Sequence, residues 1–422
     1  MKTLILFTQS FPYSKHFSEI TFLKNEIKYL SLKFDNIYVF PKEISGEMIA
    51  VPENVKINKL FSERIACKKF NFLKNIFYLF NNKLFLQELL NRPVLCIKPK
   101  YIHRLFRYIG QIIEQKKWLI KELHSVLINE TPILYTYWFT STTTALTLIK
   151  DIFAKQQIKI ISRAHGIDLY EERQGYIPLQ NQTIKALDRL YLISDHGYNY
   201  IVSKYPALKN KCKIKKLGIE KNIASVMLSN KSTYTVVSCS SVINIKRVDL
   251  ILNSLITLSQ NTDSSIKWYH FGGGVLLDQL KSRIDKLAIP NLSCFLKGFT
   301  PNIEILNFYS KNNVRCFINV SSTEGIPVSI MEAQSFGIPI IATSVGGIPE
   351  IVNANTGILL NPNPTPDQIA AAIKYLIENP EVSNKMSIES KKNWFDNFNA
   401  DKNFKSFVND IEQFYESDKK NS

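Results

Sequence analysis

The chain has 422 residues, of which 45% are hydrophobic, and a formal net charge of +17. This length exceeds what one ordinary core supports and predicts two domains of roughly 200 residues each. No apolar run reaches the roughly 18 residues of a membrane span and no secretory leader is recognisable, so we expect a cytoplasmic protein. The six cysteines are scattered without a C-x-x-C pair, which argues against a zinc site and a disulfide framework.

The positive charge is concentrated in the first half of the chain. Residues 1–230 contain 35 Lys/Arg and 18 Asp/Glu, whereas residues 231–422 contain 18 of each. Such an asymmetry predicts an anionic partner for the first half, either a membrane surface, a nucleic acid or an acidic substrate.

The first half begins with a β-α-β pattern, in which apolar strands at residues 2–9 and 36–41 flank a helix around Glu19–Leu30. Helix-length segments separate the later strands, and this alternation predicts a parallel sheet. Three further strands begin at Ile133, Ile158 and Arg189.

Between residues 59 and 127 the strand pattern gives way to helical, aromatic and basic sequence. Aromatic residues interleaved with lysines, as in Lys68–Leu90, suit a helix lying on an anionic bilayer. They equally suit a helical layer that packs Phe and Leu on the sheet, and both interpretations stay open. Nucleic-acid binding is not expected, because no recognisable nucleic-acid motif accompanies the charge.

The second half repeats the alternation after a polar stretch at residues 220–233. Strands are predicted at 235–241, 266–274, 292–298, 316–321, 338–344 and 356–360. We therefore predict an α/β protein with two halves of similar size, and the family resemblance given below implies two Rossmann-like domains facing a central cleft. The predicted parts are an N-terminal domain at 1–220 with its helical insertion at about 59–127, a C-terminal domain at 232–395, and terminal helices at 396–422 that cross back to the first domain.

The most informative segment is SSTEGIPVSIMEAQSFGIPIIATSVGGIPEIV at residues 321–352, which sets Glu324 and Glu332 around a short helix between two buried strands. Pro327 suits the first helical turn and Gly337 the helix end. A second turn, VGGIPE, follows the next strand. Two carboxylates beside a helix start predict a ligand rich in hydroxyl groups.

The same helix start predicts a phosphate cradle. The backbone N–H groups of Gly325, Ile326 and Val328 have no partner there, and the positive end of the helix dipole favours an anion. Together with the flanking carboxylates, this cradle predicts a nucleotide-sugar site.

Other candidate residues follow the strands at the edge of the sheet where α/β proteins bind ligands. Lys246 and Arg247 begin a helix after 235–241, and a lysine there can neutralise a diphosphate. Three glycines, 272–274, and then Gly298 end the next two strands, and Gly298 could offer backbone groups to a base ring.

In the first half, the strand at Ile158 ends in RAHGIDLY, which places Arg163, His165 and Asp168 within six residues. His165 could hydrogen-bond a transferred group or a phosphate, since an imidazole can act as donor or acceptor. Glu19, in the first loop, is a weaker candidate for contact with a sugar or an acceptor.

Residues 235–395 resemble the nucleotide-binding domain of retaining glycosyltransferases of the GT-B fold, family 4. The resemblance is carried by KRVDLIL, HFGGG, KGFTPNIEI, the segment from FINVSS to PEIV, and TGILL. The first half resembles the family more loosely, through FPYSKHFSEITFL and SRAHGIDLY.

The resemblance implies roles for individual residues. Glu332 would bind the ribose hydroxyls of the donor nucleotide, and Glu324 the hydroxyls of the donor sugar. Lys246 would pair with the leaving diphosphate, and His165 would face the reacting centre. The diphosphate or sugar would bind at Gly325, Ile326, Pro327, Val328 and Ser329, and the base at Gly298 and Phe299.

Two departures from the family pattern concern the donor site. Ser240 stands where the family commonly has an arginine, so Arg247 or Arg163 is expected to assist Lys246 in neutralising the diphosphate. The first strand is followed by SFPYSKHFSE, which lacks the usual glycines. No D-x-D motif is present, in keeping with the metal-independent habit of this fold, so we expect no metal ion or other cofactor.

We therefore expect a retaining transferase that moves a sugar from a nucleotide diphosphate sugar, with UDP favoured over GDP, to a glycan or polyprenyl-linked glycan in bacterial surface polysaccharide biosynthesis. The basic first domain is expected to bind the acceptor, and an anionic membrane surface is a further expected partner, on the inner face of the cell membrane. The alternatives are a GT-B UDP-sugar epimerase and a nonenzymatic nucleotide-sugar or nucleic-acid binding protein.

Overall fold

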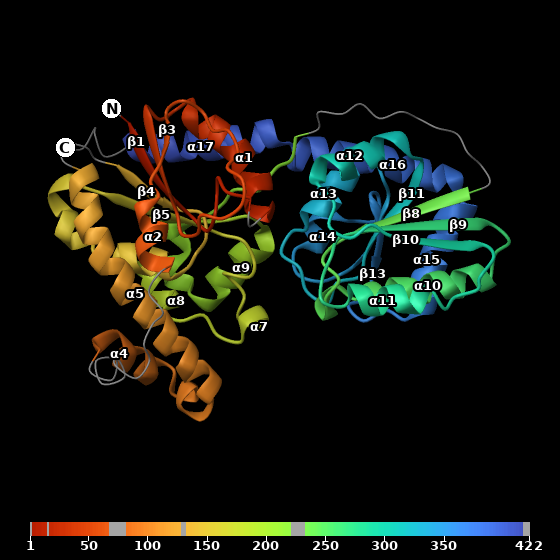
Figure 1. Ribbon diagram of the computed structural model, residues 1–422, viewed down its shortest axis with the longest axis horizontal. Helices are drawn as coiled ribbons and strands as arrows, with labels where there is room; N and C mark the ends of the chain where they lie inside the picture. The colour runs from red at the N-terminus through yellow and green to blue at the C-terminus, as the bar shows by residue number, and fades with distance from the viewer. Residues whose placement is uncertain (1, 15–16, 67–81, 128–131, 221–232, 417–422) are drawn as a thin grey trace. The chain divides into compact units, whose positions relative to one another are not determined.

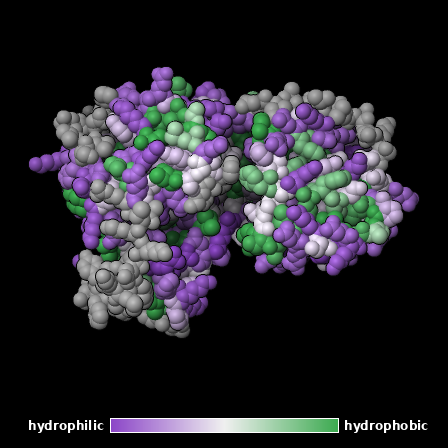
Figure 2. All heavy atoms as spheres, in the orientation of Figure 1, coloured by the Kyte–Doolittle hydropathy of each residue, from purple (hydrophilic) through white to green (hydrophobic). Residues whose placement is uncertain are grey.

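The computed structural model describes residues 2–14, 17–66, 82–127, 132–220 and 233–416. The chain forms two compact units, one made of Met1–Lys216 with Phe404–Ser422 and the other of Leu217–Asn403. Each unit has one parallel sheet covered by helices (Figure 1), as predicted. On the face drawn in Figure 2, hydrophilic side chains cover much of the described surface of both units.

The sheet of the first unit has seven parallel strands in the order β3-β2-β1-β4-β5-β6-β7. The predicted strands correspond to β1, β2, β4, β5 and β6. The strands β3 and β7 were not predicted, because three residues are too few to show a strand period. The strands are β1 Thr3–Thr8, β2 Asn36–Pro41, β3 Val55–Ile57, β4 Ile133–Thr136, β5 Lys159–Ala164, β6 Arg189–Leu192 and β7 Cys212–Ile214.

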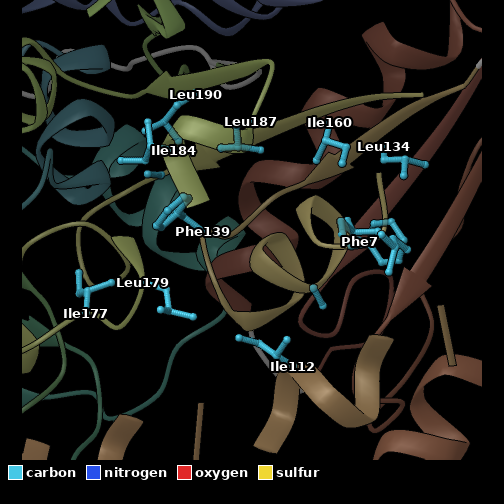
Figure 3. Packing of buried hydrophobic residues seen from close by; sticks show 14 of the residues in the cluster. Phe7, Ile112, Leu134, Phe139, Ile160, Ile177, Leu179, Ile184, Leu187 and Leu190 are labelled. Atoms are coloured by element: carbon cyan, nitrogen blue, oxygen red, sulfur yellow. The ribbon is translucent and has the colours of Figure 1, made fainter. Parts of the chain in front are cut away.

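Alternate residues of these strands face two different cores. Ile5 and Phe7 of β1 belong to a core shared with the helical insertion (Figure 3), whereas Leu4 and Leu6 belong to a core shared with α1 (Phe17–Ser31) and α17 (Ala400–Glu416). This alternation is the period of a strand that is buried on both faces. The helices of the unit are α1 Phe17–Ser31, α2 Leu60–Ala66, α4 Lys83–Asn91, α5 Pro99–Val126, α6 Ser141–Thr147, α7 Glu171–Gln174, α8 Gln180–Ala186 and α9 Asp195–Lys204.

The helical insertion packs on the sheet in its described part. Apolar side chains at helical spacing along α5, including Leu105, Ile109 and Ile112, are buried in the first core, and Phe85 of α4 stacks on Phe106. The packing interpretation thus holds for α4 and α5. Residues 67–81, which include most of the lysine-aromatic stretch, lie outside the described residues.

The sheet of the second unit has six parallel strands in the order β10-β9-β8-β11-β12-β13. All six were predicted. From β8 the chain adds β9 and β10 on one side of the sheet, and from β11 it adds β12 and β13 on the other side, so the strand order reverses between β8 and β11. Ligands of such sheets bind where the order reverses, at the carboxyl ends of the strands. The strands are β8 Thr233–Cys239, β9 Ser265–Phe271, β10 Leu292–Leu296, β11 Val314–Asn319, β12 Ile340–Thr343 and β13 Gly357–Leu360.

Helices cover both faces of this sheet (Figure 1), and α10 and α15 share one apolar core with the strands. The helices are α10 Val248–Gln260, α11 Leu277–Ile284, α12 Asn302–Lys311, α13 Val328–Ser335, α14 Ile348–Ile351, α15 Pro366–Glu378 and α16 Pro380–Asn397.

The chain returns to the first unit through its last helix, α17 (Ala400–Glu416). Phe407, Val408 and Ile411 of α17 are buried in the core that contains α1. Residues 396–397, which we expected to start the crossing, still belong to α16 in the second unit. The end of the chain, residues 417–422, lies outside the described residues.

Candidate functional site

Glu324 is the centre of a polar cluster in the loop between β11 and α13. Its carboxylate is 6% exposed, and Oε1 accepts from Lys246 Nζ at 2.5 Å, Ser321 Oγ at 2.7 Å and Asn319 Nδ2 at 3.3 Å. Within the described residues no donor binds Oε2. One oxygen is therefore held by the protein while the other remains able to accept from a ligand.

Lys246 reaches this carboxylate because β8 and β11 are adjacent strands. A short 3₁₀ turn, η4 (Asn244–Lys246), follows β8, and the backbone N–H of Ser322 donates to the carbonyl of Ile245 at 2.8 Å. The switch in strand order thus brings together the two loops that carry Lys246 and Glu324.

Arg247, predicted to assist Lys246, holds loops together. Its guanidinium donates to the carbonyl oxygens of Val320 at 2.6 Å, Ser321 at 2.9 Å and Pro362 at 2.7 Å. These bonds aim the guanidinium at the backbone of the loop that carries Glu324. The structure therefore shows Arg247 holding these loops, and its part in binding the donor stays a prediction.

The second glycine turn packs directly against the Glu324 loop. Gly346 has φ +54°, and a Cβ there would lie 1.8 Å from the carbonyl oxygen of Glu324. Gly347 donates its N–H to the carbonyl of Gly325 at 2.9 Å. Only glycine allows this approach, so VGGIPE shapes the site through backbone contact.

The helix α13 begins one residue later than predicted. Pro327 is its N-cap, in an extended conformation, and is therefore not in the first helical turn. Among the described residues, no acceptor binds the N–H groups of Gly325, Ile326, Val328 or Ser329. Because proline has no N–H, these four donors make up the predicted anion cradle.

Glu332 lies in the second turn of α13, where it is 5% exposed. Burial raises its pKa to about 7, although a hydrogen bond from Asn302 Nδ2 at 2.7 Å acts in the opposite direction. Burial raises the pKa values of Cys239 and Tyr309, and the charge of Glu332 raises them further. This carboxyl therefore changes its charge near neutral pH.

The glycines after β9 and β10 pack three loops together. Gly272 donates to the carbonyl of Gly298 at 2.8 Å, and a Cβ on Gly272 would lie 1.9 Å from the carbonyl oxygen of Ser240. Ser240 thus contributes backbone packing at the position where an arginine was expected. Gly298 faces open space, and Phe299 is 62% exposed, so both are accessible to a flat ring.

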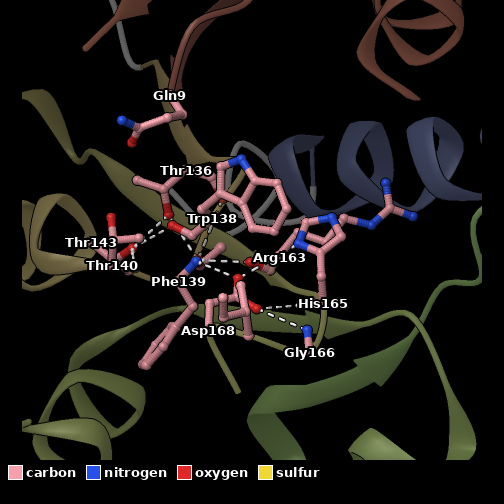
Figure 4. A network of polar contacts seen from close by, with 12 residues as sticks. Gln9, Thr136, Trp138, Phe139, Thr140, Thr143, Arg163, His165, Gly166 and Asp168 are labelled. Carbon is pink, nitrogen blue, oxygen red and sulfur yellow. Dashed lines mark hydrogen bonds and ion pairs between the residues drawn. The ribbon is translucent and has the colours of Figure 1, made fainter. Parts of the chain in front are cut away.

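His165 lies in the first unit, after β5, in a polar network drawn in Figure 4. Asp168 organises this turn by accepting the N–H groups of His165 at 2.8 Å, Gly166 at 3.0 Å and Phe139 at 3.0 Å. Burial opposes ionisation of Asp168, but hydrogen bonds and the charge of His165 hold its pKa below the ordinary value.

The imidazole of His165 is held by ring contacts. Its centroid lies 4.6 Å from that of Tyr137 and 4.3 Å from that of Trp138. Nδ1 is 3.6 Å from a carboxylate oxygen of Asp168, and neither ring nitrogen has a hydrogen-bond partner among the described residues. The ring is thus oriented and able to bond a further group.

Arg163 was predicted to help bind the donor, and the structure corrects this. Its side chain is fully buried, pairs with Glu26, donates to the carbonyl of Lys215 at 2.9 Å and stacks on Phe407. Burial raises the pKa of Glu26 despite the opposing charge of Arg163. A buried guanidinium with these partners holds the first unit together.

Glu19 is likewise not placed for contact with a sugar or an acceptor. Its carboxylate accepts the N–H groups of Gln9 at 2.7 Å, Ser10 at 2.6 Å and Phe11 at 2.8 Å. The indole of Trp138 donates to it at 2.9 Å. The glycine-free first loop is therefore ordered around an internal carboxylate.

Sequence reasoning missed four partners of the site: Ser321, Asn319, Asn302 and Trp138. Ser321 and Asn319 stand within five residues of Glu324, so their polar character at the end of a buried strand could have indicated them. Asn302 and Trp138 reach their carboxylates from other elements, and no local pattern announces such contacts.

Comparison with known families shows that residues 219–393 match the family model described as "Glycosyl transferases group 1". The amylovoran biosynthesis glycosyltransferase AmsK of Erwinia amylovora is 24% identical over 221 residues, which are 50% of this chain and 52% of AmsK. The putative colanic acid biosynthesis glycosyltransferase WcaL of Escherichia coli K12 is 24% identical over 205 residues, 47% of this chain and 50% of WcaL. The chain spans about half the length of these curated relatives.

Solved structures resemble the whole chain. Anabaena HepE in complex with UDP has a TM-score of 0.63 at 14% identity, covering 97% of this chain and 99% of HepE. The apo lipopolysaccharide outer core galactosyltransferase WaaB has a TM-score of 0.66 at 15% identity, with the same coverage. The chain therefore has the fold of GT-B glycosyltransferases.

Proposed function

We propose that the chain is a retaining glycosyltransferase that moves a sugar from a nucleoside diphosphate sugar to a glycan or polyprenyl-linked glycan in bacterial surface polysaccharide biosynthesis. The observation that carries this proposal is that Lys246 and Glu324 meet at the ends of β8 and β11, beside four N–H groups that have no acceptor in the described part of the chain. The family match over residues 219–393 supports it, as do the polysaccharide relatives. UDP is the favoured nucleotide, because HepE, with a similar fold, was solved with UDP.

The donor-side residues have complementary roles in this proposal. Transfer breaks the bond between the anomeric carbon and the diphosphate and forms one to an acceptor hydroxyl, whose proton is released. The diphosphate gains negative charge as it leaves, and Lys246 and the amides before α13 stabilise that charge without a metal ion. Glu324 offers Oε2 to the sugar, Glu332 binds the ribose, and the base lies at Gly298 and Phe299.

The first unit supplies the acceptor side. His165 hydrogen-bonds the transferred group through a ring nitrogen that has no protein partner in the described structure. None of the described helices combines the length and hydropathy needed to cross a membrane. We place the enzyme at the inner membrane face because the first half of the chain carries the positive charge, which attracts anionic lipids.

The central test is an assay of donor turnover. The purified protein is incubated with a panel of nucleotide sugars, with and without membrane extract as the acceptor source, and released nucleoside diphosphate and glycosylated product are measured. Release that requires both donor and extract is expected. Epimerised donor without extract would identify an epimerase, and donor binding without any turnover would indicate a binding protein.

Membrane association is tested separately by flotation with phosphatidylglycerol vesicles. Binding is expected at low salt and should weaken at high salt, since salt screens surface charges. Absence of flotation at low salt would rule out the membrane part of the proposal and leave the transferase part untouched.

A further inference from the structure

A polar cavity lies in the first unit, along the first half of α5. It encloses about 420 Å³. Its lining contains no carboxylate. The basic and amide side chains in the lining are Lys100, His103, Arg104, Arg107, Gln111 and Gln174. Two tyrosines, Tyr101 and Tyr108, complete the wall. The cavity therefore presents cationic groups and hydrogen-bond donors to one volume that is open to solvent.

The spacing along α5 explains this concentration of charge. Lys100, Arg104, Arg107 and Gln111 follow one another at intervals of three or four residues, which aligns them on one face of the helix. The apolar residues Leu105, Ile109 and Ile112 face the sheet core instead. The charged face of such a helix is ordinarily only solvated. Three further observations distinguish a binding face from a solvated one.

The first of these observations is that three of the cationic side chains have no counter-ion among the described residues. No ion pair within the described residues involves Lys100, Arg104 or Arg107. A few residues away the arrangement differs: Glu171 binds both Arg92 at 2.6 Å and Lys204 at 2.9 Å. Arg92 and Lys204 are thus paired with a carboxylate, whereas Lys100, Arg104 and Arg107 have no such partner among the described residues.

The second observation concerns Arg104, which is fixed while still facing the cavity. One of its nitrogens donates to the carbonyl of Gln174 at 2.7 Å. Burial and the nearby charge of Arg107 lower its pKa from the ordinary value. Two like charges held side by side are unfavourable, and an anion between them would relieve that repulsion.

The third observation is the position of these residues on the helix. The first turn of α5 contains no acidic residue, and Lys98 is its N-cap. Cations at a helix N-terminus oppose the helix dipole, whereas an anion is favoured there. Lys100, in the first turn, therefore opposes the helix dipole, and an anion bound beside it would offset that effect.

We propose that this cavity binds a phosphate-type anion, the diphosphate of a lipid-linked acceptor. Paired arginines match phosphate oxygens with several donors at once, and Lys100 and Gln111 extend the donor set along the same face. The acceptor assignment rests on the proposed function, whereas anion binding by the cavity does not.

Calorimetric titration with inorganic pyrophosphate tests the anion site. The variant Arg107→Gln removes one exposed charge from the cavity, and the matched control Lys117→Gln removes the same charge from an exposed position further along α5. We expect Arg107→Gln to weaken pyrophosphate binding by about tenfold, as for the loss of a charged hydrogen bond, and Lys117→Gln to leave it unchanged. Equal weakening by both variants would reduce the site to general surface charge and overturn the proposal.

Lys246→Gln separates this site from the donor site, where pyrophosphate could also bind. Pyrophosphate binding that survives in Lys246→Gln and is weakened in Arg107→Gln belongs to the cavity. Loss of all binding in Lys246→Gln, or absence of saturable binding to the unaltered protein, would overturn the proposal.

Kinetics with a lipid-linked glycan acceptor then test the assignment. Arg107→Gln should raise the KM for the acceptor about tenfold and leave the KM for the nucleotide sugar unchanged. A raised donor KM, or pyrophosphate displaced by phosphatidylglycerol vesicles and not by acceptor, would reject the acceptor assignment. If no nucleotide sugar turns over at all, the proposed function fails while the pyrophosphate titration still decides the anion site.

Discussion

The ammonium nitrogen of Lys246 lies 2.5 Å from Oε1 of Glu324, a residue 78 positions further along the chain. The same oxygen accepts from Ser321, so the carboxylate is held in place before any ligand binds. Preorganised charge of this kind needs little rearrangement as charge develops in a reaction. This pair therefore gives the most direct test of the donor site.

Replacing Lys246 by Gln should lower kcat by about 10²-fold to 10³-fold, in the range for loss of one electrostatic stabiliser. Donor affinity should change by less than about tenfold, because the amides before α13 remain. Steady-state kinetics and calorimetry with the donor measure the two effects. Lys281→Gln, at an exposed position of α11 in the same unit, is the control, and an unchanged kcat in Lys246→Gln would assign the leaving diphosphate to other residues.

The raised pKa of Glu332 predicts pH-dependent stability. The unfolded chain releases this proton near the ordinary value of 4.5 and the folded protein near 7, so the folded state binds more protons between these values. The free energy of unfolding therefore falls as pH rises from about 4.5 to about 7. Glu332→Gln has no such titration. Its free energy of unfolding should exceed that of the unaltered protein by about 3 kcal/mol above pH 7 and by little near pH 4.5. Denaturant unfolding at both pH values measures the difference, and a gap that does not grow with pH would contradict the assigned pKa.

The same titration should appear in nucleotide binding. Ionised Glu332 accepts ribose hydroxyls better than the protonated acid does, so UDP affinity should rise between pH 6 and pH 8. In Glu332→Gln the affinity should be lower and nearly independent of pH. Calorimetry at several pH values checks this, and an identical pH profile in both proteins would remove Glu332 from the ribose site.

Two glycines with positive φ give a matched pair of substitutions. Ala at position 346 adds a Cβ 1.8 Å from the carbonyl oxygen of Glu324, whereas Ala at position 298 meets no heavy atom within 4 Å. Gly298→Ala should lower the free energy of unfolding by about 1 kcal/mol, from backbone strain alone. Gly346→Ala should lower it by about 3 kcal/mol or more and should also remove most of the activity. Thermal unfolding and the turnover assay compare them. Equal losses of stability and activity in both variants would show that the Glu324 loop moves easily to make room for a Cβ at position 346.

The buried pair of Arg163 and Glu26 tests a structural role for Arg163. Arg163→Met leaves a buried carboxyl without its cation and should cost about 3–5 kcal/mol. The double variant Arg163→Met with Glu26→Gln removes both charges and keeps an acceptor for the hydroxyl of Tyr135, so it should recover part of that loss. Denaturant unfolding measures stability, and UDP affinity of the folded double variant should match the unaltered protein. A specific loss of UDP affinity would return Arg163 to the donor site.

Local sequence determined the elements of this protein and the segment that carries its site. Strand and helix periods, with turn residues between them, depend on neighbours along the chain, so the β-α alternation and the carboxylates around α13 could be predicted. The short strands β3 and β7 could not be predicted. Their own sequence pattern stabilises them less than their pairing with longer strands does.

Tertiary structure alone decided which protein groups each charged residue contacts. Near the ends of strands, like Lys246, three other charged residues are tied to protein groups. Arg163 pairs with Glu26, Arg247 binds carbonyls of the Glu324 loop, and Glu19 accepts from the amides after β1. The physical reason is that a buried charge must be satisfied by whichever groups the fold brings near, and those groups come from distant parts of the chain. Lys246 meets Glu324 for the same reason, since the order of parallel strands places the ends of β8 and β11 side by side.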